Sequence, residues 1–191
     1  MTQRRIYQNT YPYHLTTVTK NRRWAFRDVK LAWKLHQAIL GACFVKGYTA
    51  LAFCILPDHI HLLVWKHIPA RVGEPTLGLD EIQTQLLFPE AQRAFSNVRD
   101  NNHDDISYLM KSIKGTFARS ISSGPIWQPS FNSRIVDSDQ RLYNTLQYIQ
   151  YNYRKHKLPA HYGQAPYTFL NIPKSIYNID QNRFFSYDGR D

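Results

Sequence analysis

The chain has 191 residues, of which 43% are hydrophobic and 20% are charged, a composition that fits one soluble globular domain and excludes an intrinsically disordered chain. Its 24 Lys and Arg residues against 14 Asp and Glu give a formal net charge of +10, which favours a polyanionic partner such as DNA. No apolar run approaches the roughly 18 residues that a membrane span needs, so no membrane association is expected. The two cysteines, Cys43 and Cys54, stand in apolar surroundings and predict buried, reduced thiols in a cytoplasmic protein.

The N-terminal third predicts one strand, one helix and two further strands. Residues 13–19 are β-branched and aromatic, as is typical of a strand. Residues 29–46 carry apolar side chains at helical spacing and precede Gly47, which is placed to end a helix. Two apolar runs, 49–56 and 59–66, then predict adjacent antiparallel strands joined by a tight turn.

Residues 67–104 differ from the rest, since they hold three prolines, are acidic and show little periodicity. Long segments of this kind are usually functional or disordered. We interpret residues 67–104 as an insertion within a single domain that spans residues 1–191.

The C-terminal part predicts a helix from about residue 105 to 121, a strand at 131–136 and a helix at 138–157. Residues 159–191 predict an irregular tail, with a short strand at 167–170 as one option. The order β-α-β-β-α-β followed by a helix predicts the ferredoxin-like split βαβ fold of the α+β class. In this fold the first two helices cover one face of an antiparallel sheet, and here an additional helix follows at the C-terminal end.

Two histidines on the strand at 59–66 are the first candidates for a functional site. Side chains two residues apart in a strand lie on the same face, so His59 and His61 project together, away from the two predicted sheet-covering helices. Two imidazoles held side by side are suited to bind one metal ion. The alternative is that they are polar residues at a strand end that bond to loop backbone.

The last predicted helix carries a second group of polar residues. Tyr148, Asn152 and Lys155 are four and seven residues apart, so they share one face of the helix, off the buried stripe. The alternative is an ordinary solvated helix face.

Three segments resemble one family when taken in order: Leu-Pro-Asp-His-Ile-His-Leu-Leu-Val (56–64), Ile-Trp-Gln-Pro-Ser-Phe (126–131) and Tyr-Ile-Gln-Tyr-Asn-Tyr-Arg-Lys-His-Lys-Leu (148–158). Together they are similar to the HUH single-tyrosine transposases, specifically to the REP-associated tyrosine transposase branch of the IS200-like transposases. The segment Thr-Val-Thr-Lys-Asn-Arg-Arg (17–23) resembles the opening strand and basic loop of that group.

The resemblance implies a role for each matching residue. His59 and His61 would be ligands of a divalent metal ion, Mg²⁺ or Mn²⁺, and Asn152 would complete the site. Tyr148 on the C-terminal helix would be the nucleophile. Family members cut single-stranded DNA at palindromic hairpins, and they leave a 5′-phosphotyrosine on the enzyme and a free 3′-OH. The expected function is therefore metal-dependent DNA nicking and strand transfer in DNA transposition, in the bacterial cytoplasm near the nucleoid.

Basic residues spread along the chain are candidates for contacts with DNA phosphates: Arg4, Arg5, Arg22, Arg23, Lys111, Lys114, Lys155 and Lys157. The chain departs from the family at Tyr153, where a proline is common, and this change predicts an unbroken helix. The REP-associated branch can act as monomers, and we expect a monomer here, with a dimer as the alternative.

Two other functions remain open. One is a non-cleaving protein that binds hairpin or single-stranded DNA and derives from a transposase. The other is a metal-dependent hydrolase that uses the histidine pair without covalent chemistry. The hydrolase is disfavoured because the one nearby carboxylate, Asp58, is expected by strand alternation on the opposite face from His59.

Overall fold

The structure of the protein, a computed structural model, describes residues 11–66, 106–121 and 125–171. The predicted insertion at 67–104 and the DNA-contact candidates Arg4 and Arg5 lie outside these residues. The described elements, in chain order, are β1 (Tyr13–Val18), η1 (Lys20–Arg22), η2 (Ala25–Arg27), α1 (Val29–Val45), β2 (Tyr48–Leu56), β3 (His59–Lys66), α4 (Ile106–Ile121), β4 (Asn132–Ile135), α5 (Asp139–Lys155), η3 (Ala160–Gly163) and β5 (Thr168–Leu170).

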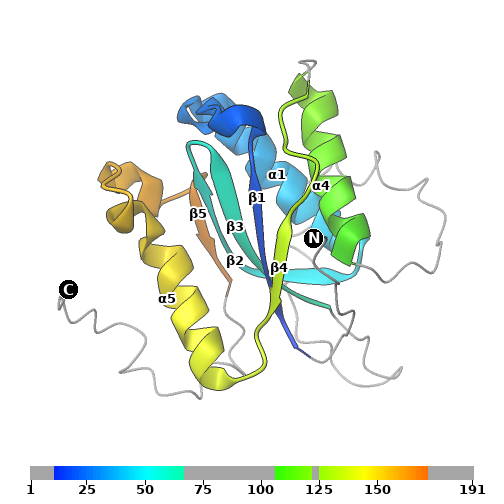
Figure 1. Ribbon diagram of the computed structural model, residues 1–191, viewed down its shortest axis with the longest axis vertical. Coiled ribbons are helices and arrows are strands. Elements are labelled where there is room, and N and C mark those ends of the chain that lie inside the picture. Colours follow the sequence, from blue (N-terminus) through cyan, green and yellow to red (C-terminus); the bar gives the residue numbers. More distant parts are fainter. Residues whose placement is uncertain (1–10, 67–105, 122–124, 172–191) are drawn as a thin grey trace, which may run out of the picture.

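A five-stranded sheet with the order β4-β1-β3-β2-β5 forms the centre of the molecule (Figure 1). Every neighbouring pair of strands is antiparallel. The first four strands have the split βαβ arrangement, which confirms the predicted α+β fold. The short strand expected near residue 170 is also confirmed: β5 pairs with β2 and extends the sheet at that edge.

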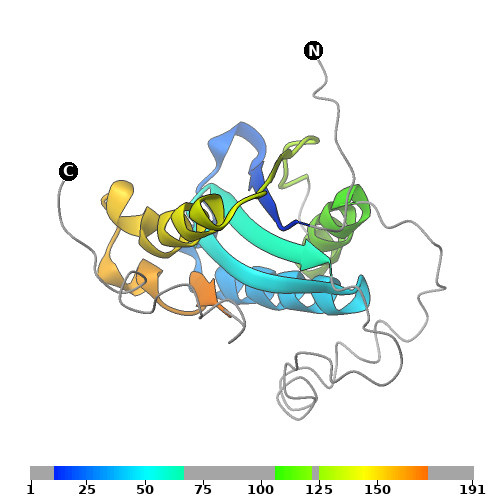
Figure 2. The ribbon, with the colours of Figure 1, turned by 90° about the horizontal axis from the view of Figure 1, so that it is seen from below.

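One face of the sheet is covered by α1 and α4, which lie side by side (Figures 1 and 2). Leu15, Ile60 and Leu62 point into this layer and are fully buried, as strand alternation predicts. Phe117 on α4 belongs to the same core. Among the described helices none is both long and apolar enough to cross a membrane.

Among the described helices, α5 is the one that covers the opposite face, as Figure 2 shows. Leu142, Leu146 and Ile149 on α5 form a second, smaller core with side chains of β2 and β3, among them Cys54 and Leu63. Both cysteines are free and buried as predicted, and burial raises the pKa of each thiol to about 12. The two histidines of β3 therefore lie between the sheet and α5.

Side-chain caps mark where α1 and α5 begin, and Gly47 ends α1 as predicted. Asp28 caps α1 by accepting a hydrogen bond from the backbone N–H of Lys30, and Gly47 follows the helix with a φ of 64°. Ser138 caps α5 by accepting from the backbone N–H of Arg141. The cap fixes where α5 starts, and so it sets which of its residues face the sheet.

Candidate active site

His59 and His61 lie next to each other on the face of β3 that α5 covers. Both are largely buried, with 8% and 7% of their surfaces exposed, and their ring centroids are 5.1 Å apart. The tight turn before β3 places them at the start of the strand, in the middle of the sheet. This position confirms the predicted face of the pair.

Tyr148 reaches this histidine pair from α5. Its hydroxyl oxygen is 3.3 Å from Nε2 of His61, and the two rings meet edge to face with centroids 5.0 Å apart. The Lys155 ammonium lies 5.1 Å from the centroid of the Tyr148 ring. Residues 87 positions apart in the sequence therefore form one polar site, as the family resemblance implied.

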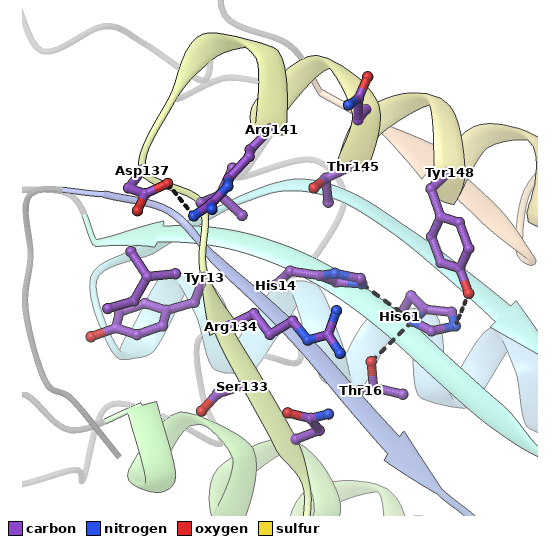
Figure 3. A pocket seen from close by; sticks show the side chains of 14 residues that line it. Tyr13, His14, Thr16, His61, Ser133, Arg134, Asp137, Arg141, Thr145 and Tyr148 are labelled. Carbon is purple, nitrogen blue, oxygen red and sulfur yellow. Dashed lines mark hydrogen bonds and ion pairs between the residues drawn. The ribbon is translucent and has the colours of Figure 1, made fainter. Parts of the chain in front are cut away.

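The other side of the His61 ring contacts β1. Nδ1 of His61 is 3.0 Å from the Thr16 hydroxyl and 3.2 Å from Nε2 of His14 (Figure 3). Burial, together with the smaller effects of the neighbouring His14, His59, His156 and Lys155, lowers the pKa of His61 to about 3. His61 is therefore a neutral imidazole at physiological pH, with Nε2 directed at the tyrosine.

Asp58 corrects the expectation that its carboxylate would face away from His59. Oδ1 of Asp58 is 2.5 Å from Nδ1 of His59, because Asp58 lies in the turn before β3 and strand alternation does not apply to it. Burial by itself raises the pKa of Asp58, but the hydrogen bonds and charges of His59 and Arg22 hold it below its usual value. Nδ1 of His59 therefore donates to a carboxylate, which leaves Nε2 with a free lone pair.

Asn152 lies one turn after Tyr148 on the buried side of α5, which corrects the prediction that it would lie off the buried stripe. Only 1% of its surface is exposed, and neither Oδ1 nor Nδ2 has a hydrogen-bond partner among the described residues. A buried polar group without a partner costs about 1–3 kcal/mol, so such a group is usually retained for a purpose. Its oxygen is available as a ligand.

These residues fit a divalent metal ion in chemical terms. Two neutral imidazoles and one amide oxygen supply three donors, and a carboxylate behind a ligating histidine is a common feature of metal sites. Asp58 behind His59 has this arrangement. In the described part of the chain, no group of three or more His, Cys, Asp or Glu side chains is placed to hold a metal ion.

The described basic candidates fall into three groups. Arg22 and Lys155 lie at the site, since Arg22 is 3.2 Å from Asp58 and Lys155 stands over Tyr148. Arg23 and Lys157 are exposed in the segments that follow η1 and α5.

Lys111 and Lys114 lie on α4, on the face of the sheet away from Tyr148. Lys114 donates to the backbone carbonyls of Gln128 and Ser130, at 2.8 and 2.9 Å. Its ammonium therefore holds the loop before β4, and the predicted DNA contact at Lys111 and Lys114 is separated from the histidine site.

Sequence reasoning missed three residues of the site: His14, Thr16 and His156. His14 and Thr16 alternate on β1 in the same way as the histidines on β3, and the register pairs Thr16 directly with His61. His156, eight residues after Tyr148, ends α5 with its ring centroid 5.3 Å from that of His59. The period-two and helical spacings were visible in the sequence, but the register of β1 against β3 was not.

Comparisons with known proteins agree with this architecture. The family model for IS200-like transposases matches residues 7–93. A protein of Haemophilus influenzae named as a REP-associated tyrosine transposase is 31% identical over 137 residues, which cover 70% of this chain and 66% of that protein.

A solved structure of a REP-associated tyrosine transposase bound to a REP hairpin superimposes with a TM-score of 0.64. The match covers 100% of this chain and 94% of the other at 18% identity, so it supports the fold. The chain therefore belongs to the IS200-like transposases, in the branch of the REP-associated tyrosine transposases.

Proposed function

We propose that the protein is a metal-dependent enzyme that nicks and rejoins single-stranded DNA beside palindromic hairpins, with Tyr148 as its nucleophile. The observation that carries the proposal is the 3.3 Å contact between the Tyr148 hydroxyl and Nε2 of His61. A tyrosine without a partner is a weak nucleophile at neutral pH, because phenols ionise near pH 10. Here the hydroxyl is beside a neutral base and under a lysine ammonium.

The proposed chemistry is one exchange of phosphoester bonds. The Tyr148 oxygen attacks a DNA phosphate, the bond from phosphorus to the 3′-oxygen breaks, and a 5′-phosphotyrosine forms. The departing 3′-oxygen takes up a proton and becomes a free 3′-OH. Attack by a 3′-OH on the phosphotyrosine reverses the exchange and joins strands without ATP.

The protein's own groups favour the first step electrostatically. Without a metal ion, Nδ1 of His61 donates to the Thr16 hydroxyl and Nε2 accepts a hydrogen bond from Tyr148, which positions the tyrosine beside the proposed metal site. The positive charge of Lys155 near the ring favours negative charge on the phenolic oxygen.

His59, His61 and Asn152 would hold the metal ion, either Mg²⁺ or Mn²⁺, and Nε2 of His61 would then bind the ion instead of accepting a hydrogen bond from Tyr148. When bound, such an ion polarises the scissile phosphate and offsets the charge that develops on it. Asp58 would orient His59 from behind, as its 2.5 Å contact indicates. A hairpin substrate is supported by the solved relative, which is bound to a REP hairpin. That the enzyme acts as a monomer stays a prediction.

The test incubates the protein with single-stranded hairpin DNA and Mg²⁺ or Mn²⁺ and separates the products on denaturing gels. We expect a covalent protein–DNA adduct with the wild-type protein and none with Tyr148→Phe. Tyr151→Phe, the same change on the same helix, is the matched control and should keep the adduct.

Cleavage that survives Tyr148→Phe would overturn the proposal and favour a metal-dependent hydrolase. Asp58 beside His59 makes that outcome chemically reasonable. Hairpin binding without cleavage under either metal would instead identify a non-cleaving DNA-binding protein derived from a transposase.

A further inference from the structure

A groove extends from the Tyr148–His61 pair across β1 to β4 and the first turns of α5 (Figure 3). Its volume is about 950 Å³, at the upper end of the ~300–1,000 Å³ that is usual for ligand pockets. One end of the groove is therefore the site proposed for strand cleavage, and the rest has no role in the chemistry described above.

The charge of the groove comes from two arginines and one aspartate. Arg141 is paired with Asp137 at 2.6 Å, so these two charges offset each other. Arg134 has no hydrogen-bond or ion-pair partner among the described residues that line the groove, and its side chain extends over the sheet toward Thr16 and His61 in Figure 3. The uncompensated positive charge of the groove therefore belongs to Arg134.

The register of the sheet explains why Arg134 points there. Arg134 on β4 is directly opposite His14 on β1, so both side chains lie on the face covered by α5. His14 in turn contacts Nδ1 of His61, whose Nε2 contacts Tyr148. A row of side chains across the sheet, Arg134, His14 and His61, thus leads to Tyr148, the proposed nucleophile.

A guanidinium with free donors in an open groove is suited to bind a phosphodiester through two parallel hydrogen bonds. Asn132 and Asn144 on the walls add amides that can bond to base edges.

We propose that this groove holds the DNA strand next to the cleavage point, with Arg134 bound to a phosphate adjacent to the one that Tyr148 attacks. The inference rests on the proposed function, because it takes Tyr148 as the reacting end of the groove. The adjacent phosphate is assigned because β4 is two strands away from β3, about 10 Å at the usual strand spacing of ~4.8 Å. Arg134 is thus a binding residue for the substrate strand, separate from the residues that do the chemistry.

The test measures hairpin binding in a Tyr148→Phe background, where no cleavage is expected. The probe is a hairpin oligonucleotide with a single-stranded flank, in which each phosphate around the cleavage point is replaced in turn by an uncharged methylphosphonate. Arg134→Gln is compared with Arg119→Gln, which removes the same charge from α4 on the other face of the sheet. Fluorescence anisotropy gives the Kd of each combination.

We expect one methylphosphonate, next to the scissile position, to weaken binding about ten-fold in the parent protein and in Arg119→Gln. Arg134→Gln should weaken binding to the unmodified oligonucleotide by a similar factor, and the same methylphosphonate should then have no further effect. Arg134→Lys, which keeps the charge, should regain part of the affinity and so exclude a folding defect.

Two results would overturn the inference. One is that each methylphosphonate changes the Kd of Arg134→Gln and of Arg119→Gln by the same factor. The other is that Arg134→Gln becomes insensitive to the methylphosphonate at the scissile phosphate instead of the one next to it. Failure of the proposed function is recognised separately, because the wild-type protein would then form no Tyr148 adduct with the unmodified oligonucleotide.

Discussion

The two nitrogens of His61 have different partners, and this division organises the site. Nδ1 is held by β1 through Thr16 and His14, while Nε2 is directed at Tyr148 on α5. The ring therefore cannot rotate without breaking contacts on both sides. A rigidly placed imidazole is what either a metal ligand or a proton acceptor requires.

Asp58 is expected to act through His59. Asp58→Asn keeps the size of the side chain but removes the negative charge that fixes the His59 tautomer. We expect the Mg²⁺ or Mn²⁺ concentration needed for half-maximal nicking to rise by roughly 10–100-fold, as is usual when such a partner is lost. Hairpin affinity measured without metal should stay unchanged. An unchanged metal requirement in a nicking titration would contradict the role of Asp58.

The buried amide of Asn152 is expected to lower the free energy of unfolding and to be required for metal-dependent nicking. Asn152→Leu replaces a buried, unpartnered amide by an apolar side chain of similar length, so in EDTA it should raise the free energy of unfolding by about 1–3 kcal/mol. The same change should abolish metal-dependent nicking. Denaturant unfolding measures the first effect, with Asn144→Leu, an exposed position on the same helix, as the control with little change expected. Destabilisation by Asn152→Leu would show that the amide has a structural partner.

At the scale of elements, α5 connects the site to the C-terminal segment. The helix stays unbroken to Lys155, as predicted from Tyr153 at a position where the family often has proline. The Tyr153 ring packs against η3, where a Cβ added to Gly163 would lie 2.7 Å from the ring. Gly163 thus permits a close contact between α5 and the following turn.

Gly163→Ala is expected to destabilise the protein by pushing Tyr153, and with it the end of α5, away from η3. Core overpacking of this kind costs typically about 1–3 kcal/mol. Gly115→Ala on α4 is the matched control. Its Cβ would meet only the Arg119 side chain at 3.5 Å, and a helical alanine should stabilise by about 0.5–1 kcal/mol. Thermal unfolding should therefore shift in opposite directions in the two variants, and a shift in the same direction would refute the contact.

At the scale of the whole molecule, buried histidines couple stability to pH. The pKa values of His61 and His14 fall from 6.5 to about 3 and about 4, chiefly through burial, and that of His36 is lowered for the same main reason. Between these values and pH 6.5 the unfolded chain binds more protons than the folded one, so stability decreases as pH falls.

Denaturant unfolding in EDTA should therefore show full stability above about pH 6.5 and a continuous loss from there toward pH 4. His14→Gln should reduce the slope of the free energy of unfolding against pH in this window, since one group fewer then has different pKa values in the folded and unfolded states. A stability that stays constant between pH 7 and pH 4 would mean that these rings are accessible to protons in the folded protein.

The spacing of apolar residues, together with turn residues such as Gly47, allowed most of the fold to be predicted. Alternation placed His59 and His61 on the face away from α1 and α4, and helical spacing placed Tyr148 and Asn152 together on α5. The position of Asp58 could not be predicted, because it lies in a turn where neither period applies. His14 and Arg134 join the site only through strand register, which side-chain pairing across the sheet determines.

In the proposed reaction, Tyr148 becomes covalently bonded to DNA. The most direct measurement is mass spectrometry of the proteolysed adduct after reaction with hairpin DNA and Mn²⁺. We expect the nucleotide mass on the peptide that contains Tyr148, with fragmentation placing a 5′-phosphate on this tyrosine. A nucleotide on another tyrosine of α5, such as Tyr143 or Tyr151, or cleaved DNA with no modified peptide, would contradict the account.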